Sequence, residues 1–312
     1  MDPATGQILA LTSLPSYLPE DYKKYPPENY RIPAIADTYE PGSTFKTVVM
    51  ASALDAGVIK PDDVCADPCQ GPVQIGKYQI KTWDNHYFPG QTMTEILERS
   101  DNVGMVYVGS LIGKSAFAKY LHDFGIGQPT HIDLEAETVP KLKSSWGDID
   151  LATASFGQGL AVTSIEMVSA VGAIANGGTL MEPHIVTAVR SSDQTIPIPP
   201  KRVRQVIKPQ TAREMTAMMV KSAQHGEANW TIPEGYQIAG KTGTAQVPIA
   251  GHYDTENTIA SFIGFAPADK PRFVMLVKLK APQSSPWASE TAAPLWFKIM
   301  TDILHYANIP PQ

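Results

Sequence analysis

The sequence predicts a mixed α and β fold, with a mainly antiparallel central sheet flanked by helices and a mostly helical subdomain. Three alternating apolar stretches lie in the last third, at residues 236–247, 258–266 and 272–280, and hairpin-like loops join them. The middle third instead repeats apolar residues at helical spacing. Residues 7–13 have the same strand-like character, so we expect an N-terminal strand to close the sheet.

The first third is expected to continue from that strand as an irregular surface connection. Residues 15–42 contain six prolines, which disfavour regular structure. A Pro-Gly turn then gives way to an apolar stripe at three-to-four spacing, which predicts a helix from about Ser43 to Gly57. Residues 60–91 are predicted to be loop, with a hairpin around residues 73–80.

The middle third is predicted to be largely helical. Thr-x-x-Glu capping boxes at residues 92–95 and 163–166 mark two helix starts. The second capped helix should end at the Asn-Gly-Gly of residues 176–178. Further helices are expected at residues 103–112, 114–124, 209–224 and 291–306, and a linker at residues 191–200.

We interpret residues 1–312 as one domain built of two subdomains. The sheet subdomain takes about residues 1–42 and 225–312, and the mostly helical one about residues 43–224. A chain of 312 residues can bury a sizeable core, and 43% hydrophobic residues is ordinary for a globular protein. The net charge of -6, without a cluster of basic residues, argues against a nucleic-acid partner.

Two features bear on the cellular compartment. The two cysteines, Cys65 and Cys69, are four residues apart and can form a disulfide or stay free thiols, whereas zinc needs more ligands than this loop offers. No apolar run approaches the ~18 residues of a membrane span. We expect a domain excised from a longer protein, because the chain starts directly with turn residues.

Ser43 is the first candidate for chemistry. It lies at the first turn of its predicted helix, where unpaired N–H groups and the helix dipole favour developing negative charge. Lys46 follows on the same helical face and can reach Ser43. A serine hydroxyl needs a base, and a desolvated lysine can serve as one. Because Ser-x-x-Lys is common by chance, this interpretation needs support elsewhere in the chain.

Residues 100–102, Ser-Asp-Asn, give the first support. The tripeptide is predicted to lie in a loop between two helices. The hydroxyl of Ser100 can relay a proton, and the amide of Asn102 can both donate and accept hydrogen bonds. Alone, the tripeptide would be interpreted as an ordinary turn.

Residues 241–244, Lys-Thr-Gly-Thr, give the second support. They begin just inside a predicted strand. Gly243 leaves space where another backbone or a ligand must come close, and the hydroxyls of Thr242 and Thr244 share one face. With Lys241, this strand offers a cation and two hydroxyls to a carboxylate.

The three motifs together are typical of penicillin-binding proteins and class A β-lactamases. The stretches 2–10, 40–46, 156–159 and 241–246 resemble class B penicillin-binding proteins, the monofunctional peptidoglycan transpeptidases, over essentially the whole chain. The resemblance implies a β-lactamase/transpeptidase-like fold. Family members usually carry a membrane anchor and a non-catalytic N-terminal domain, which this sequence does not include, and many have serine in place of Asp101.

The resemblance implies a role for each catalytic residue. Ser43 would be the acylated nucleophile, and Lys46 its base, kept partly neutral by burial and by the charge of Lys241. Ser100 would pass a proton to the departing D-Ala. Asn102 would orient Lys46 and the substrate backbone.

The resemblance also implies how substrate is held. Thr242, Gly243 and Thr244 would form the substrate-binding edge, with Lys241 beside the terminal carboxylate. The backbone N–H groups of Ser43 and Thr244 would form the oxyanion hole. Neither a metal nor a cofactor is implied.

The implied function is that of a peptidoglycan D,D-transpeptidase, which cross-links stem peptides in cell wall synthesis and is acylated by β-lactam antibiotics. It would act outside the cytoplasm, anchored by an N-terminal membrane helix, with a membrane-embedded glycosyltransferase partner reached through the missing N-terminal part. The alternatives are a D,D-carboxypeptidase, a serine β-lactamase, and a β-lactam sensor or non-catalytic scaffold. A lactamase needs a deacylating base, and the sequence leaves Glu135, Glu137 and Glu166 open for that role.

Overall fold

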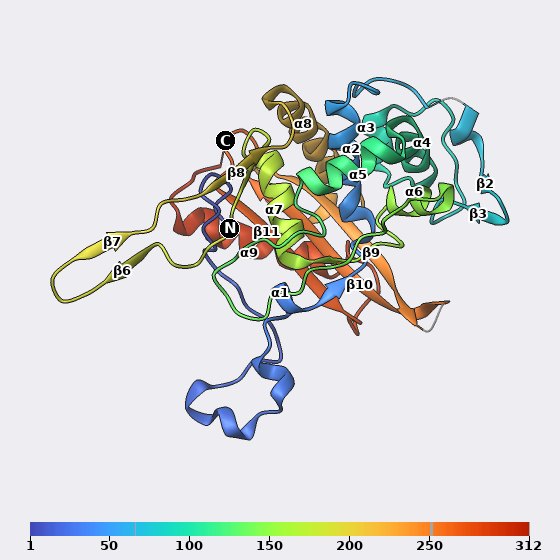
Figure 1. The fold of residues 1–312 in the computed structure, drawn as a ribbon. Helices are drawn as coiled ribbons and strands as arrows, with labels where there is room; N and C mark the ends of the chain where they lie inside the picture. Colours follow the sequence, from blue (N-terminus) through green and yellow to red (C-terminus); the bar gives the residue numbers. More distant parts are fainter. Residues whose placement is uncertain (66, 250–251, 312) are drawn as a thin grey trace.

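A three-stranded antiparallel sheet forms the centre of the molecule (Figure 1). The computed structural model describes residues 1–65, 67–249 and 252–311. Within these residues the sheet has the order β11-β10-β9, so β10 is the middle strand. The bounds are Ala239–Ile249 for β9, His252–Ala266 for β10 and Phe273–Lys280 for β11. The three late strands that the sequence predicts are confirmed, and so is their antiparallel pairing.

The α-helices lie largely where the sequence predicts them. Thr92 and Thr163 each accept a hydrogen bond from the backbone of the glutamate three residues on, so both capping boxes are confirmed. The short helices α1 and α6 are the exceptions, because one or two turns give too little periodicity to predict them. The bounds are Pro33–Ala36 for α1, Lys46–Asp55 for α2, Met93–Glu98 for α3, Asn102–Ile112 for α4, Lys114–Asp123 for α5, Asp148–Ala154 for α6, Ser164–Ala175 for α7, Pro209–His225 for α8 and Ala292–Tyr306 for α9.

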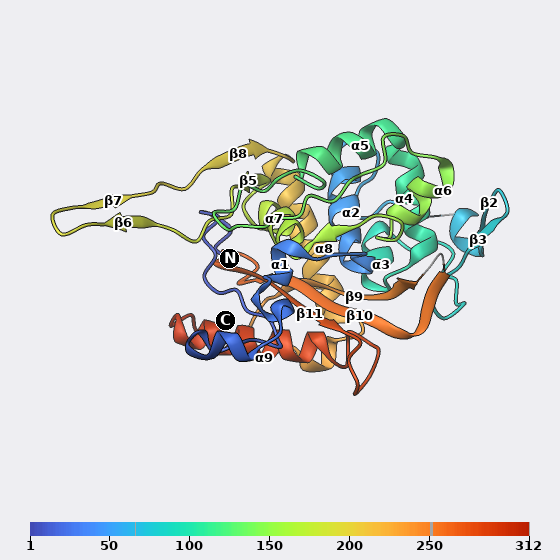
Figure 2. The same ribbon diagram turned by 60° about the horizontal axis from the view of Figure 1, so that its bottom comes forward.

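Helices cover both faces of the central sheet (Figure 2). Successive strand residues point to opposite faces of the sheet, and both faces of β10 pack against helices. Ala260 and Phe262 pack with α9, where the ring centroids of Phe262 and Trp296 lie 4.9 Å apart. Ile259 and Ile263 belong to the larger core on the other face, which includes α2, α7 and α8. The mixed α and β fold with helices flanking an antiparallel sheet is therefore confirmed.

Short two-stranded antiparallel pairs lie around the central sheet. The pair β2–β3 is the hairpin predicted around residues 73–80. The other pairs are β1–β4, β5–β8 and β6–β7. The bounds are Thr38–Tyr39 for β1, Val73–Ile75 for β2, Tyr78–Ile80 for β3, Val162–Thr163 for β4, Thr179–Met181 for β5, Ala188–Arg190 for β6, Thr195–Pro197 for β7 and Arg202–Gln205 for β8.

The predicted N-terminal strand at residues 7–13 is wrong. Within that stretch only Gln7 forms a β-bridge, and it lies outside the central sheet. Met1 instead pairs with the edge of β11, through two backbone hydrogen bonds to Val274 of 2.9 Å each. A tight turn at residues 2–6 then directs the chain away from the sheet before the apolar stretch begins.

The expected linker at residues 191–200 is also wrong in part. Residues 191–197 of this stretch are the turn and second strand of the β6–β7 hairpin, which projects from the body of the molecule (Figures 1 and 2). Val189 and Ile196 are register partners in this hairpin. The N–H of Ser191 donates to the carbonyl of Gln194 across the turn at 2.9 Å. Strands of three residues are too short for alternation to reveal them.

The proline-rich connection at residues 15–42 runs over the surface as predicted, but it contains short helical turns. Two 3₁₀ turns, Pro19–Lys24 and Pro27–Tyr30, each begin with proline, and so does α1. The fixed φ of proline suits the first position of a helical turn. No helix within the described residues is both long enough and apolar enough to cross a bilayer. The division into two subdomains stays a prediction.

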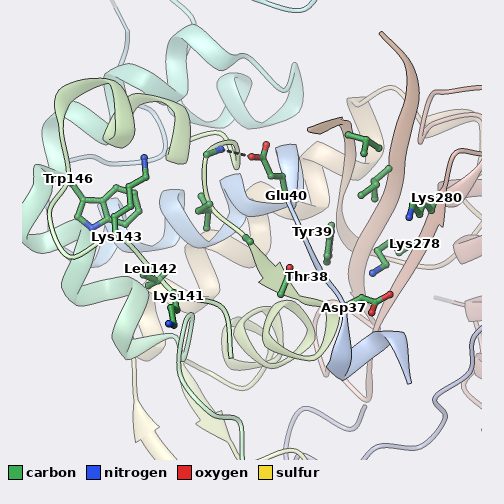
Figure 3. Close-up of a pocket in the computed structure, with 15 residues that line it drawn as sticks. Asp37, Thr38, Tyr39, Glu40, Lys141, Leu142, Lys143, Trp146, Lys278 and Lys280 are labelled. Carbon is green, nitrogen blue, oxygen red and sulfur yellow. Dashed lines mark hydrogen bonds between the residues drawn. The ribbon is translucent and has the colours of Figure 1, made fainter. Parts of the chain in front are cut away.

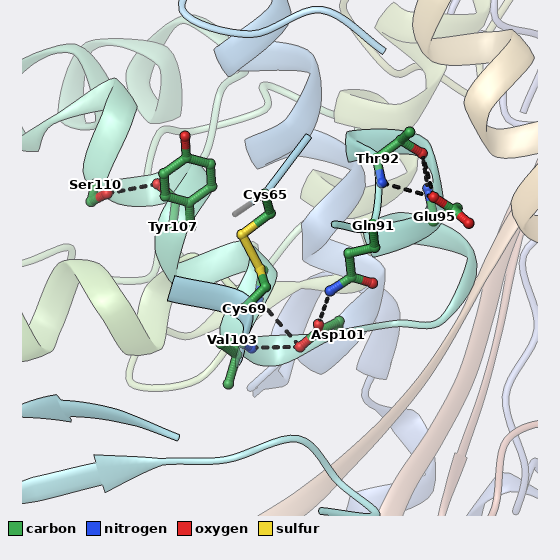
Figure 4. The surroundings of a disulfide bond; sticks show 10 residues. Cys65, Cys69, Gln91, Thr92, Glu95, Asp101, Val103, Tyr107 and Ser110 are labelled. Carbon is green, nitrogen blue, oxygen red and sulfur yellow. Dashed lines mark hydrogen bonds between the residues drawn. A yellow bond between two sulfur atoms is a disulfide. The ribbon is translucent and has the colours of Figure 1, made fainter. Parts of the chain in front are cut away.

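Cys65 and Cys69 form a disulfide (Figure 4), which decides between the two states that the sequence left open. Both cysteines are buried. The N–H of Cys65 donates to the carbonyl of Gln91 at 2.9 Å, and the side chain of Gln91 in turn donates to the carboxylate of Asp101. The disulfide loop thereby supports the loop that carries the Ser-Asp-Asn motif.

Candidate active site

The turn that carries Ser43 begins the predicted helix. A 3₁₀ turn, Gly42–Phe45, leads into α2, so the serine precedes the first α-helical residue, Lys46. The hydroxyl of Thr44 donates to the carbonyl of Pro41 at 2.8 Å and closes this turn. The predicted start of the helix at about Ser43 is confirmed.

Strand β9 supports one side of this turn. A Cβ placed at Gly243 would lie 2.8 Å from the methyl carbon of Thr44 and 3.1 Å from the carbonyl oxygen of Pro41. Any larger residue would push the turn away from the strand. The glycine of Lys-Thr-Gly-Thr therefore allows the close approach between two segments that lie about two hundred residues apart in the sequence.

The loop at residues 156–159 supports the other side. The N–H of Gly42 donates to the carbonyl of Gly157 at 3.0 Å, and the N–H of Gly159 donates to a carboxylate oxygen of Glu40 at 3.1 Å. Gly157 has a φ of +84°, and a Cβ there would lie 2.0 Å from the carbonyl oxygen of Gly42. The turn that carries Ser43 is thus held between a strand and a glycine-rich loop.

Lys46 points into the protein and is fully buried, with a relative exposure of 0%. Its ammonium donates to Oδ1 of Asn102 at 2.8 Å, to Oγ of Ser100 at 3.3 Å and to the carbonyl oxygen of Ser100. The structure therefore brings the lysine of the first motif into direct contact with the outer residues of the second.

The backbone of the second motif explains this contact. Ser100 has a φ of +57°, a left-handed conformation that is unusual for serine and that is found often at functional sites. Asp101 then caps α4, accepting from the N–H groups of Val103 at 2.8 Å and Gly104 at 3.2 Å (Figure 4). The middle residue of the motif therefore has a capping role, for which either aspartate or serine is suited.

The pKa values of the two buried lysines, Lys46 and Lys241, are both lowered. Burial, and then the nearby charge of Lys241, lower the pKa of Lys46 well below its usual value. Burial lowers the pKa of Lys241 to about 8, while the carboxylate of Glu227 acts in the opposite direction. The ammonium of Lys241 lies 3.2 Å from Oγ1 of Thr242. A neutral Lys46 beside a charged Lys241 is therefore accessible near neutral pH.

A hollow of about 80 Å³ opens over these groups. It collects Ser43, Ser100, Asn102, Thr242 and Thr244 of the predicted site. Lys46 and Lys241 are buried and are not among its lining residues, and Gly243 packs against the turn that carries Ser43. The hollow is lined by Gly42, Ser43, Trp83, Ser100, Asn102, Phe156, Gln158, Glu227, Thr242, Thr244 and Trp287.

Several of these lining residues lie outside the motifs that the sequence analysis identified. Trp83 and Trp287 come from distant loops and meet edge to face, with ring centroids 5.6 Å apart. Glu227 follows α8 and is the one ionisable side chain among the lining residues. The N–H of Ala288 donates to Oγ1 of Thr244 at 3.0 Å and so ties the Trp287 loop to the motif. The sequence carries no local pattern that would have found Glu227 or Trp287.

The carboxylates left open as deacylating bases lie elsewhere. Glu166 caps α7, accepting from the N–H groups of Thr163 at 2.6 Å and Gly127 at 2.7 Å, and burial raises its pKa to about 7. Glu137 accepts from the N–H of Thr130 at 2.8 Å. Neither these two nor Glu135 lines the hollow.

Comparison with known proteins agrees with this geometry. The family model described as the penicillin binding protein transpeptidase domain matches residues 1–303. Stage V sporulation protein D of Bacillus subtilis is 36% identical over 325 residues, covering 100% of this chain and 49% of the relative. A probable peptidoglycan D,D-transpeptidase, PenA of Neisseria meningitidis, is 32% identical over 315 residues, covering 100% and 52%.

Solved structures agree as well. Penicillin binding protein 3 from Mycobacterium tuberculosis, complexed with aztreonam, superposes with a TM-score of 0.91 at 29% identity, covering 100% of this chain and 72% of that one. The transpeptidase domain of Burkholderia pseudomallei penicillin-binding protein 3 gives a TM-score of 0.86 at 26% identity, covering 100% and 88%. The chain spans about half the length of the curated relatives it matches. From this match, the fold and the three motifs, the chain belongs to the penicillin binding protein transpeptidase domain family.

Proposed function

We propose that this chain is the catalytic domain of a peptidoglycan D,D-transpeptidase that works through an acyl-enzyme on Ser43. The observation that carries the proposal is the placement of Lys46. Its ammonium is fully buried, contacts both Ser100 and Asn102, and has a pKa well below the usual value for lysine. Such a lysine can take a proton from a serine hydroxyl at neutral pH.

In the first half-reaction, the terminal carboxylate of a stem peptide binds beside Lys241, Thr242 and Thr244. The hydroxyl oxygen of Ser43 attacks the carbonyl of the penultimate D-Ala, and Lys46 accepts the hydroxyl proton. The N–H groups of Ser43 and Thr244 stabilise the oxyanion. The C–N bond then breaks as its nitrogen receives, through Ser100, the proton that Lys46 accepted, and the terminal D-Ala leaves.

In the second half-reaction, a primary amine of another stem peptide attacks the acyl-enzyme. The amine gives up a proton to Lys46, the bond between the acyl carbon and the oxygen of Ser43 breaks, and that oxygen takes the proton from Lys46. The products are a cross-linked peptide and free enzyme. A β-lactam acylates Ser43 by the same first step, because its strained amide mimics the D-Ala-D-Ala bond.

The disulfide supports an extracytoplasmic location, since disulfides persist in oxidising compartments. Peptidoglycan stem peptides are the substrates of the proposal, and β-lactams are its inhibitors. The resemblance to class B enzymes extends the proposal to an N-terminal membrane anchor and to a membrane-embedded glycosyltransferase partner reached through that part. An aztreonam complex of a similar structure is consistent with β-lactam binding.

The test separates the transpeptidase from its alternatives by products. The protein is incubated with a peptide ending in D-Ala-D-Ala and a peptide bearing a primary amine, and the products are identified by mass spectrometry. We expect a joined peptide and released D-Ala with the wild type, and neither with Ser43→Ala. A trimmed donor without a joined peptide would indicate a carboxypeptidase. No change in the donor would contradict the proposal and favour a scaffold or sensor.

A further inference from the structure

Two hollows lie beside the turn that carries Ser43, and they differ in charge. The larger one, of about 510 Å³, is lined by four lysines and two carboxylates (Figure 3). The smaller one, of about 80 Å³, lies over Ser43, and we call it the active-site hollow. Among the described residues that line it, Glu227 is the one with an ionisable side chain. A cation is therefore disfavoured in the larger hollow and favoured in the active-site hollow.

Glu227 is held in place by its neighbours in the chain. Helix α8 ends at His225, whose Nδ1 lies 3.4 Å from a carboxylate oxygen of Glu98 at the end of α3. On the other side of Glu227, Ala228 is buried in the core that contains α9. Because Glu98 lies two residues before Ser100, these two anchors place Glu227 beside the loop that carries the Ser-Asp-Asn motif.

The carboxylate of Glu227 is accessible to a ligand. Among the described residues it forms no ion pair and no hydrogen bond, and the residue is exposed. Its charge acts on the two lysines of the site, since it raises the pKa of Lys46 and of Lys241. Both lysines are buried, whereas Glu227 is not, so its carboxylate remains available to a cation that enters the active-site hollow.

The second substrate of the proposed reaction is such a cation, because a primary amine is positively charged at neutral pH. The terminal D-Ala has by then left with its carboxylate, so Lys241 no longer has that partner. An ammonium that approaches the ester of Ser43 is repelled by Lys241, and Glu227 offsets this repulsion. The rings of Trp83 and Trp287 line the same hollow and add aromatic surface, which attracts cations.

We infer that Glu227 selects the acceptor by binding its positively charged amine. This inference rests on the proposed function, because an acceptor is needed only after Ser43 has been acylated. The ammonium loses one proton to solvent and becomes the nucleophile. Its nitrogen becomes positive again as it bonds to the acyl carbon, until a second proton passes to Lys46 and from there to the leaving oxygen of Ser43. Glu227 stabilises the positive charge at both stages and is thus a specificity-determining residue.

The test lets two acceptor peptides compete for one acyl-enzyme, formed from a donor peptide ending in D-Ala-D-Ala. The acceptors are identical except that one carries a primary amine and the other an aminooxy group, a nucleophile that is uncharged at neutral pH. The ratio of the two joined peptides is measured by mass spectrometry for the wild type, Glu227→Gln and Glu234→Gln. Both products come from the same acyl-enzyme, so their ratio does not depend on how fast Ser43 is acylated. Glu234→Gln is the matched control, because it removes the same charge from an exposed residue outside the hollow.

We expect Glu227→Gln to lower the ratio of amine product to aminooxy product about fivefold or more, and Glu234→Gln to leave it at the wild-type value. Since Glu227 is exposed, its substitution should leave the melting temperature nearly unchanged. An equal ratio in Glu227→Gln and the wild type would overturn the inference. An equal fall in both variants would also overturn it, since a charge outside the hollow would then have the same effect.

A binding measurement separates this inference from the proposed function. If neither acceptor gives a joined peptide, the transpeptidase proposal fails. The amine peptide and its N-acetylated form are then titrated calorimetrically into the wild type and Glu227→Gln. A preference of the wild type for the amine form that is lost in Glu227→Gln would support the inference. No preference in the wild type, or one that Glu227→Gln keeps, would overturn it.

Discussion

Lys46 is the residue on which the proposed chemistry depends most. A fully buried ammonium is costly unless it is hydrogen-bonded, and three oxygens of residues 100 and 102 accept from it. The same oxygens can also accept hydrogen bonds from the neutral amine, whose lone pair can accept a proton. The contacts thus position the lysine, and burial lowers its pKa so that the neutral amine can accept a proton.

Glu227 is expected to set the pH range in which this pair of lysines works. It lines the active-site hollow, and its negative charge raises the pKa of both Lys46 and Lys241. Acylation in the proposed mechanism needs a neutral Lys46 and a charged Lys241, so its rate should rise with pH as Lys46 loses its proton. The rate should fall again above about 8, where Lys241 loses its own.

Removing that charge should shift the whole profile. Glu227→Gln lowers both lysine pKa values, because the charged forms lose a stabilising neighbour, so both limbs should move to lower pH. The measurement is the rate of benzylpenicillin acylation as a function of pH, with Glu234→Gln as the control, since Glu234 is exposed outside the hollow. Identical profiles for Glu227→Gln and the wild type would show that the carboxylate does not act on the lysines.

At the scale of elements, the site depends on a turn held between a strand and a loop. The 3₁₀ turn Gly42–Phe45 packs on β9 at Gly243 and bonds to Gly157 on the other side. Neither support is adjacent to the turn in the sequence. Packing at this density transmits small changes, because interiors have few voids into which a side chain can move.

Gly157→Ala should therefore slow the acylation of Ser43 directly, in addition to lowering the stability of the protein. The new methyl group would lie 2.0 Å from the carbonyl oxygen of Gly42, so the turn carrying Ser43 must shift. Strain from the positive φ adds about 1 kcal/mol or more. We expect a loss of at least tenfold in the rate of benzylpenicillin acylation, with a lowered melting temperature.

Gly177→Ala is the matched control for that variant. Gly177 also has a positive φ, +60°, but nothing lies within 4 Å of a Cβ placed there. It should lose stability from backbone strain and keep the wild-type acylation rate. If the two variants lost acylation equally, the loss could not be assigned to the contact between Gly157 and the turn that carries Ser43.

Local patterns predicted the three motifs well because each depends on its own neighbours. A Pro-Gly turn before an apolar stripe places Ser43 at a helix start, and a capping box fixes the helix before Ser100. The residues that complete the hollow could not be predicted in the same way. Glu227 and Trp287 are brought there by the packing of α8 and of the loop after β11, which no local periodicity encodes.

At the scale of the whole molecule, the sheet shows where strand prediction fails. Three long strands pair as their alternation predicts, but the strand-like residues 7–13 do not join them. The edge of β11 next to that end of the chain is taken by Met1, and the turn that follows leads the chain elsewhere. Alternation shows that a segment can pair, whereas the geometry of the preceding turn decides whether it reaches the sheet.

The most direct test of the account is intact-mass spectrometry of the protein after incubation with benzylpenicillin, followed over hours. Ser43→Ala is measured beside it, and Ser110→Ala, an exposed serine on α4, is the control. We predict one lasting adduct on the wild type and on Ser110→Ala, and none on Ser43→Ala. An adduct on Ser43→Ala, or none on folded wild-type protein, would contradict Ser43 as the nucleophile. An adduct that disappears as hydrolysed penicillin accumulates would contradict the transpeptidase and favour a β-lactamase.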